Sequence, residues 1–338
     1  MEVYAGIDLH SSNNYLGIID EEDRRLYQRR LPNRLGDILL ALEPFKESLQ
    51  GVVVESTYNW YWVVDGLQEH GYQVHLANPS AIVQYEGLKH IDDKWDSFWL
   101  AHMKRLGILP EGYIYPKEER PVRDLLRRRL LFVRHRTSHI LSLQSSITRN
   151  LGYKMTVREI KRLEACDAER IFEDPFLVSS AKNRISTIIF LSERIKNIEK
   201  QVKTHVRFKP EFVHLKTIPG IGEILGLTIM LEVGDISRFP KVSNYSSYCR
   251  CVKSERFSNK KKKGEGNRKN GNKYLSWAYV ESANFAIRSY PEFQSFYNSK
   301  KAKRNGVVAI KALSNKLARA SYYVMRDKVP YDSGKMFR

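Results

Sequence analysis

Residues 122–203 contain one glycine and one proline, and apolar residues recur through them at helical spacing. The apolar positions run from residue 125 to 147 and again from 185 to 198. We therefore predict two long helices around an intervening piece at residues 152–175, which form a helical hairpin or coiled-coil stalk over residues 120–205. Such a stalk either pairs with a second copy, which gives a dimer or a tetramer, or packs within its own chain.

Residues 1–115 have the pattern of a mixed α/β domain. Apolar runs predict strands at residues 3–8, 15–20, 25–31, 51–55 and 72–77, and helical spacing predicts helices at 35–49, 60–70 and 93–106. This order of elements is that of the ribonuclease-H-like fold, in which acidic residues meet at adjacent strand ends and on the last helix. Residues 110–121 are typical of a linker, and residues 207–338 of a separate helical domain.

Four carboxylates in the first domain have the placement that a two-metal site needs. Asp8 ends the apolar run VYAGID, and Glu55 ends the run VVVE. Asp93 and Asp96 are three residues apart on the last predicted helix, so they share one face. Such a group can hold two Mg²⁺ roughly 3.5–4 Å apart, the arrangement that cleaves phosphodiesters by in-line displacement. His10 either touches this site or caps a turn.

The chain is strongly basic, with 57 Lys and Arg against 38 Asp and Glu and a formal net charge of +19. A soluble protein this cationic usually binds a polyanion, so nucleic acid is the expected partner. A ribosome-associated protein and a binder of anionic membranes are the alternatives. No window approaches the roughly 18 apolar residues of a spanning helix, and no signal peptide precedes the first strand. The three cysteines form neither a disulfide framework nor zinc spacing, so we expect a cytoplasmic protein without a membrane partner.

Positive charge gathers in two segments. Seven Arg and one Asp lie between residues 120 and 136, including Arg127 and Arg128, so one flank of the stalk is cationic. Residues 250–273 hold ten Lys and Arg against two Glu and are interrupted by three glycines. We interpret this segment as a mobile loop that orders on a phosphate backbone. Its expected nucleic-acid-binding residues are Lys260, Lys261, Lys262, Lys263, Arg268 and Lys269.

Residues 215–225, with the sequence LKTIPGIGEIL, have the shape of a helix-hairpin-helix turn. Gly220 and Gly222 would let the backbone N–H groups at the following helix N-terminus approach a phosphate. The alternative is a tight turn that binds no ligand.

Three stretches of the chain match a known pattern in order and spacing. They are GIDLH at residues 6–10 with Glu55 later, DKWDS at 93–97 followed by LA at 100–101, and a C-terminal block with PGIG at 219–222, GDI at 234–236 and KNGN at 269–272. The chain thereby resembles the insertion-sequence transposases whose N-terminal domain is like the RuvC Holliday-junction resolvase, a group that includes the Piv-type DNA invertases. The position of Lys94 in this pattern favours Asp93 over its rival Asp92.

The resemblance implies a RuvC-like acidic tetrad at Asp8, Glu55, Asp93 and Asp96, with bound Mg²⁺. It also implies a nucleophilic serine in the C-terminal domain, which aligns with Ser258. The chain departs from the family pattern at three positions, where Asn259 and Arg250 replace glycines and Ser97 replaces an alanine. Ser254 is therefore the second candidate for the nucleophile.

By the same resemblance, a structured non-coding guide RNA pairs with donor and target DNA, and the protein holds the backbones by charge and shape. The leading hypothesis is an RNA-guided transposase or recombinase that cleaves and rejoins DNA strands. A plain metal-dependent nuclease of the junction-resolvase type would need the tetrad alone. A non-catalytic nucleic-acid-binding protein would need neither the tetrad nor Ser258.

Overall fold

The computed structural model of the chain describes residues 1–82, 93–206, 210–253, 255–258, 261–265 and 270–336. Within these ranges, the side chains of residues 93–94, 205–206, 255–258, 262–263 and 265 fall outside the description. The chain folds into two compact units, Met1–Lys117 and a second formed by Glu118–Gly266 with Gly271–Arg338.

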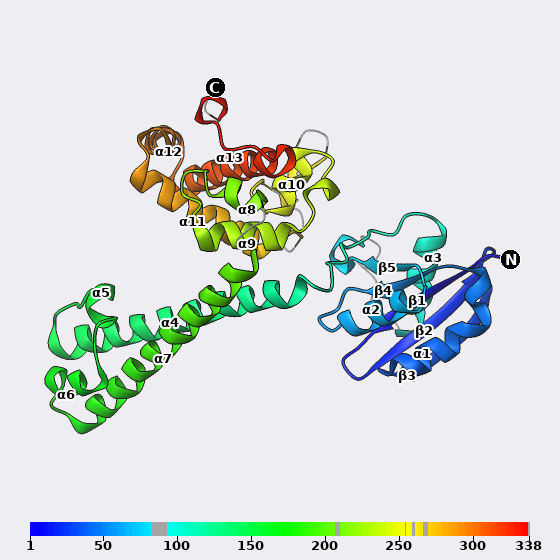
Figure 1. Cartoon of the computed structure of the whole chain (residues 1–338), viewed down its shortest axis with the longest axis horizontal. Helices are drawn as coiled ribbons and strands as arrows, with labels where there is room; N and C mark the ends of the chain where they lie inside the picture. Colours follow the sequence, from blue (N-terminus) through cyan, green and yellow to red (C-terminus); the bar gives the residue numbers. More distant parts are fainter. Residues whose placement is uncertain (83–92, 207–209, 254, 259–260, 266–269, 337–338) are drawn as a thin grey trace. The chain divides into compact units, whose positions relative to one another are not determined.

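The first unit contains a five-stranded sheet in the order β3-β2-β1-β4-β5 (Figure 1). Strands β1 (Val3–Leu9), β2 (Asn13–Asp20) and β3 (Arg25–Pro32) are antiparallel neighbours. Strands β4 (Leu49–Glu55) and β5 (Val74–Ala77) run parallel to β1. The predicted order of strands and helices in this unit is confirmed.

Helices cover both faces of this sheet. Alternate residues of a strand point to opposite faces, and Ala5 and Ile7 of β1 share a core with α1 (Leu35–Leu42) and α2 (Tyr61–Glu69). On the other face, α3 (Asp93–Arg105) packs through Leu100 and Met103 against Val53 of β4.

One predicted helix is shorter than expected. The helical spacing predicted residues 35–49, but α1 ends at Leu42 and a 3₁₀ helix, η1 (Glu43–Ser48), follows it. Pro44 explains the change, because proline cannot donate the backbone hydrogen bond that continues an α-helix. A second short 3₁₀ helix, η2 (Pro79–Ala81), follows β5.

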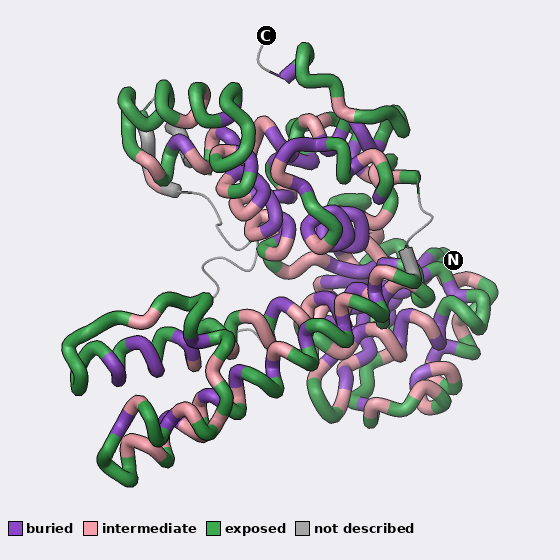
Figure 2. Tube along the Cα trace, turned by 60° about the vertical axis from the view of Figure 1, so that its left-hand side comes forward, coloured by how far each residue is buried: buried purple, intermediate pink, exposed green. Residues whose placement is uncertain are grey.

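The second unit begins with the predicted helical hairpin. Helices α4 (Arg120–Leu151) and α7 (Pro175–Val206) pack side by side (Figure 1). Short helices α5 (Val157–Ile160), η4 (Ala165–Asp167) and α6 (Ala168–Ile171) connect them. Buried and exposed residues alternate along the long helices in Figure 2, as expected for two amphipathic helices that bury one stripe each. We call α4 and α7 the stalk.

A helical body completes this unit. Its helices are α8 (Pro210–Leu215), α9 (Glu223–Val233), η5 (Ile236–Arg238), α10 (Val242–Tyr248), α11 (Lys273–Ser289), α12 (Pro291–Lys303), α13 (Gly306–Asp327) and η6 (Ser333–Lys335). Every residue of α9 from Leu225 to Val233 is buried, so this helix forms the centre of the body's core.

The basic segment at 250–273 differs from the prediction of a mobile loop. Strands β6 (Glu255–Ser258) and β7 (Lys261–Glu265) pair there as an antiparallel hairpin, in which Arg256 lies opposite Gly264. The charge run and its glycines concealed the hairpin, because backbone pairing stabilises strands that lack the β-branched residues on which strand prediction relies.

Candidate functional site

Two of the predicted acidic residues lie side by side at the ends of neighbouring parallel strands. Ile7 of β1 is paired with Val54 of β4, so the next residues along the two strands, Asp8 and Glu55, are also neighbours. Both are two residues beyond positions that face α3, Gly6 and Val53, and side chains two apart share a face of the sheet. Asp8 and Glu55 therefore project on the side of the sheet that α3 covers.

Two glycines bring α3 close to this face. Gly6 of β1 and Gly17 of β2 are cross-strand partners. A Cβ atom at Gly6 would lie 2.0 Å from the backbone oxygen of Ser97, and one at Gly17 would lie 2.8 Å from the Ser97 hydroxyl oxygen. Ser97 is fully buried in this seat, and the preceding residue, Asp96, is half-buried. The glycine pair thus fixes where α3 presents Asp96.

The electrostatics of Glu55 link three of the carboxylates. Burial, a hydrogen bond with Asp8 and the negative charges of Asp8 and Asp96 together raise the pKa of Glu55 to about 8. Asp8 itself is only 5% exposed. Carboxylates this close repel one another when ionised. Such a cluster is relieved either by a shared proton or by a cation.

The fourth member of the predicted tetrad is only partly visible. Asp93 is the first residue of α3, one helical turn before Asp96, but its side chain lies outside the described residues. Asp92 lies outside them altogether. Among the described residues, no three His, Cys, Asp or Glu side chains already form a group that could hold a metal ion. Strand register places Asp8 beside Glu55, and the charge of Asp96 acts on the Glu55 carboxyl, which connects the three residues.

His10 and two asparagines support the end of β1. The Nε2 atom of His10 lies 2.9 Å from Oδ2 of Asp8. The backbone carbonyl of His10 accepts hydrogen bonds from Nδ2 of Asn33 at 2.9 Å and Nδ2 of Asn59 at 3.0 Å. Sequence reasoning missed both asparagines, because each lies in a connection far along the chain and only the fold brings it to His10.

Ser258 is the last residue of β6 and is paired with Lys261 of β7. Its side chain lies outside the described residues, as do those of Lys262 and Lys263 in β7. Lys261 is exposed. The predicted residues Ser254, Lys260, Arg268 and Lys269 lie wholly outside the described part of the chain.

Gly220 has a packing role in the turn between α8 and α9. Its φ is +82°, and a Cβ atom there would lie 2.2 Å from the backbone oxygen of Ser282 in α11. Gly222, by contrast, is exposed and immediately precedes α9. Glu223, the first residue of α9, forms an ion pair with Lys203. A phosphate at this helix end would therefore meet a carboxylate.

The two predicted arginines of α4 differ in their surroundings. Arg127 binds Glu232 of α9 with two hydrogen bonds, Nε to Oε1 at 2.6 Å and Nη2 to Oε2 at 2.7 Å. Arg128 is exposed, and its guanidinium lies 5.2 Å from the centre of the Phe132 ring. Arg128 can thus reach a phosphate without breaking an ion pair, whereas Arg127 cannot.

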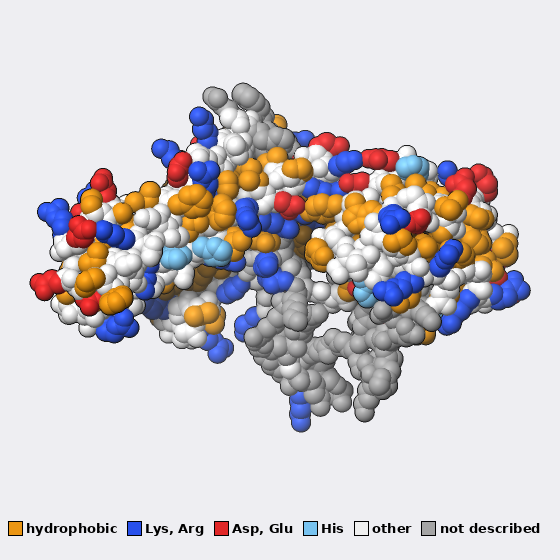
Figure 3. Space-filling view, turned by 90° about the horizontal axis from the view of Figure 1, so that it is seen from below, with side chains coloured by type: hydrophobic (Ala, Val, Ile, Leu, Met, Phe, Trp, Pro, Cys, Tyr) orange, Lys and Arg blue, Asp and Glu red, His pale blue; other side chains and the backbone are white. Residues whose placement is uncertain are grey.

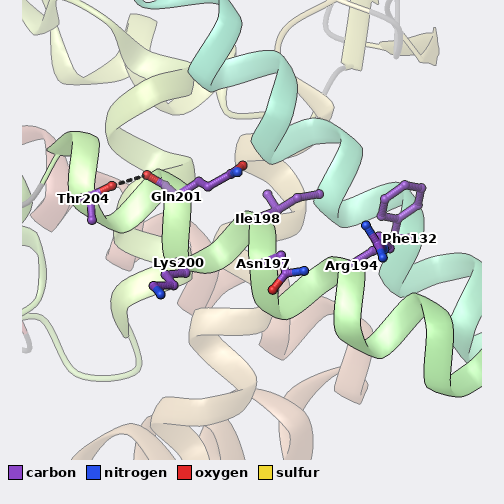
Figure 4. Close-up of a pocket in the computed structure, with 7 residues that line it drawn as sticks. All are labelled: Phe132, Arg194, Asn197, Ile198, Lys200, Gln201 and Thr204. Carbon is purple, nitrogen blue, oxygen red and sulfur yellow. Dashed lines mark hydrogen bonds between the residues drawn. The ribbon is translucent and has the colours of Figure 1, made fainter.

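A hollow of about 500 Å³ lies between the stalk helices close to Phe132. Its lining combines cations and amides, as Figure 4 shows: Arg194, Asn197, Lys200 and Gln201 project from α7, beside Ile198 and Thr204. Across the face in Figure 3, Lys and Arg side chains are interspersed with hydrophobic ones along the stalk. This mixture suits a backbone phosphate together with a stacked base.

None of the helices that the structure describes has both the length and the apolar character needed to cross a membrane.

Two transposase family profiles match the chain. A profile described as Transposase, DEDD_Tnp_IS110, matches residues 5–149, which contain Asp8, Glu55 and α3. A second, described as Transposase IS116/IS110/IS902 family, matches residues 213–298, which contain α9, the β6–β7 hairpin and α11. The DEDD character of the first profile indicates use of a divalent metal.

Two curated transposases match nearly the whole chain, and a third relative matches less than half of it. The transposase for insertion sequence element IS1328 of Yersinia enterocolitica is 27% identical over 94% of this chain and 95% of the relative. The transposase for insertion sequence element IS1111A of Coxiella burnetii is 22% identical over 97% and 91%, respectively. An uncharacterised 43.6 kDa protein of insertion element IS110 from Streptomyces coelicolor is 23% identical over 44% of this chain and 37% of that protein.

Proposed function

We propose that this chain, which belongs to the IS110 family of transposases, cleaves and rejoins DNA strands with an acidic tetrad and the hydroxyl of Ser258. The observation that carries the proposal is the cluster of Asp8, Glu55 and Asp96, whose mutual repulsion and burial raise the pKa of Glu55 to about 8. Buried carboxylates gathered at strand ends are costly for the fold unless they share a proton or bind a cation.

The acidic cluster suits Mg²⁺, which prefers carboxylate oxygens. We assign its ligands to Asp8, Glu55, Asp93 and Asp96 and propose that they hold two ions. Bound there, Mg²⁺ would lower the pKa of a hydroxyl and neutralise charge on the scissile phosphate. The protein's part is to hold Asp8 and Glu55 in register and to seat α3 through Gly6 and Gly17.

Ser258 supplies the nucleophile in this proposal. Its oxygen loses the hydroxyl proton and forms a bond to the phosphorus of a DNA phosphodiester while the bond to one deoxyribose oxygen breaks. That deoxyribose oxygen takes up a proton, which leaves a phosphoserine link and a free strand end with a hydroxyl. Attack by another strand end on the same phosphorus reverses the chemistry and joins new strands. The link retains the energy of the phosphodiester, so no other energy source is needed. Because serine is a weak nucleophile at its ordinary pKa, it needs a metal or base for activation.

The partners in this proposal are donor DNA, target DNA and a structured guide RNA. The described cations that would hold these backbones are Lys261 of the hairpin, Arg128 of α4, and Arg194 and Lys200 in the stalk hollow (Figure 4). Charge of this kind gives affinity without reading sequence, which leaves sequence choice to base pairing with the RNA. The working unit would be a dimer or tetramer of this chain.

The central test is where a covalent DNA adduct forms. The protein, purified with its co-expressed RNA, is incubated with donor DNA and Mg²⁺, denatured, and mapped by mass spectrometry. We expect phosphoserine-linked nucleotide at Ser258 in the wild type and none in Ser258→Ala or Asp8→Asn. Ser179→Ala and Glu47→Gln, at exposed positions, are the controls and retain the adduct. An adduct that persists in Ser258→Ala would refute the assignment.

A second candidate function follows from the position of Asp8, Glu55 and Asp96 within a single unit. A metal-dependent nuclease needs only such a cluster, with water as the nucleophile. In that case Ser258→Ala cleaves DNA at the wild-type rate and leaves hydrolysed ends, and no adduct forms on any serine.

A further inference from the structure

The two ends of the segment that carries Ser258 are fastened to each other. The backbone N–H of Asn272 donates to the carbonyl of Tyr248 at 2.6 Å, and Nε of Arg250 donates to the carbonyl of Gly271 at 3.0 Å. Gly271 has a φ of +88°, and a Cβ atom there would lie 2.5 Å from the Tyr248 carbonyl oxygen. The segment from residue 250 to residue 271 therefore has both of its ends at one place on the helical body.

Asn272 is the buried side chain at this point, with 8% exposure. Its Oδ1 atom accepts from the backbone N–H groups of Tyr274 and Leu275, which caps the N-terminus of α11. Its Nδ2 atom donates to Oε2 of Glu232 at 2.7 Å. The Asn272 side chain thus contacts both α11 and α9 at the place where the segment that carries Ser258 ends.

Glu232 connects the same point to the stalk. This carboxylate is 2% exposed, and both of its oxygens accept hydrogen bonds from Arg127 of α4. Burial lowers the pKa of Arg127, but the hydrogen bonds and negative charge of Glu232 outweigh it and raise that pKa above its ordinary value. The Arg127 guanidinium also lies 4.5 Å from the centre of the Tyr274 ring.

A need for stability alone does not explain this network. A buried ion pair often contributes no more than apolar residues of the same volume, because its desolvation offsets its attraction. The polar groups add contacts of fixed geometry. Each hydrogen bond fixes an atom of Asn272 or Glu232 relative to a particular helix, and an apolar contact would let those helices slide.

We propose that Glu232 is a positioning residue for strand transfer, which holds the ends of the segment that carries Ser258 at a set place relative to the stalk. The chain of contacts runs from Arg127 on α4 through Glu232 on α9 to Asn272, which follows that segment. The position of the nucleophilic hairpin is thereby fixed relative to nucleic acid that is bound on the stalk. The inference rests on the proposed function of Ser258.

The first measurement is hydrogen exchange of backbone amides in Glu232→Gln, which keeps the shape of the side chain and removes its charge. We expect roughly tenfold or faster exchange at residues 271–275, because a hydrogen bond to a charged group is weakened, with no change in the stalk core around Ile185. The matched control is Glu199→Gln, which breaks the ion pair between Arg129 and Glu199 in the same stalk. That control should leave residues 271–275 unchanged.

The second measurement separates positioning from binding. In Glu232→Gln we expect the rate of adduct formation to fall about tenfold or more while the Kd for DNA stays within twofold of the wild type. Arg127→Lys retains the charge but loses the two-pronged geometry, and it should have an intermediate rate. If Glu232→Gln fails to fold, Arg127→Lys tests the positioning role in its place.

The outcomes separate this inference from the function on which it rests. A wild-type protein that forms no adduct on Ser258 refutes the proposed function. An adduct that forms as fast in Glu232→Gln as in the wild type, or exchange at 271–275 that does not change, overturns the positioning role alone. Loss of DNA binding equal to the loss of rate also overturns it, because a merely structural residue would act in that way.

Discussion

The carboxylate site and the serine hairpin are held in place by different means. Asp8, Glu55 and Asp96 are located by strand register and by the close seat that Gly6 and Gly17 provide for α3. The segment that carries the β6–β7 hairpin is instead fastened at its two ends by directed hydrogen bonds of Asn272, to Tyr248 and to Glu232. Close packing positions the carboxylate site, and polar contacts position the serine hairpin. Substitutions that change side-chain volume should therefore affect the carboxylate site most. Substitutions that remove a charge or a hydrogen bond should affect the serine hairpin most.

The largest expected effect comes from adding one methyl group beneath α3. Gly6→Ala would place a Cβ atom 2.0 Å from the Ser97 backbone oxygen, so the helix must move. We expect overpacking to lower the free energy of unfolding of the first unit by about 1–3 kcal/mol. Because the shift displaces Asp96, DNA cleavage should fall at least about 100-fold, beyond the 10- to 100-fold typical of a lost supporting contact at a metal site.

Gly36→Ala is the matched control for this substitution. Gly36 lies within α1, and no atom approaches the position of its Cβ within 4 Å. Alanine is the better helix former by about 1 kcal/mol, so stability should rise slightly and cleavage stay unchanged. Tryptophan fluorescence during urea unfolding reports mainly on the first unit, since only Trp277 of the five tryptophans lies outside it. Equal cleavage rates in the two variants would contradict the seat described for α3.

A smaller effect is expected from the protonation of Glu55. Its pKa of about 8 lies above the ordinary value of 4.5, so the folded protein holds a proton that the unfolded chain releases. Without divalent metal, the contribution of Glu55 to the free energy of unfolding should thus be fully present below about pH 4.5. It should be lost as the pH rises through 8. Glu55→Gln removes this dependence on pH. The difference in Tm between the wild type and Glu55→Gln should therefore change between about pH 4.5 and pH 8.

Mg²⁺ sharpens the same measurement. At pH 8.5 the ion should raise the Tm of the wild type, because binding to the folded state alone stabilises it. Mg²⁺ should raise the Tm of Glu55→Gln much less. A Tm difference that is independent of pH would show that the carboxylates are not electrostatically coupled, and shape alone would then account for the first region.

The smallest effect concerns the stalk hollow. Lys200→Ala should weaken binding of the co-purified RNA at low salt and lower the slope of log Kd against log salt concentration by about 1, the value for one lost phosphate contact. Lys182 forms an ion pair with Glu169 elsewhere on α7, so Lys182→Ala is the control and should leave the slope unchanged. The same slope in both variants would remove the hollow from the nucleic-acid surface.

Local patterns in the sequence predicted the framework of the first unit. Apolar runs and helical spacing predicted the order of its elements, and Asp8 and Glu55 could be placed at strand ends because each ends an apolar run. The helical hairpin was equally accessible, since the stretch between Pro121 and Pro175 contains a single glycine, Gly152, which has the φ of +77° expected at a helix end.

Contacts between distant residues could not be predicted in this way. Gly6 and Gly17 are recognisable as a pair only once their strands are in register. Arg127 looked like a phosphate ligand because the sequence around it is basic, whereas its partner Glu232 lies 105 residues away. The hairpin at residues 255–265 was hidden because its charged residues carry no strand preference.

Tyr248 and Arg250 contact Gly271 and Asn272, so the segment between them can vary in length around the Ser258 that it carries. Because its entry and exit lie together, its length and composition can change at little cost in chain entropy, which grows only slowly with loop length. A relative could carry a longer or differently charged insert here on an unaltered helical body.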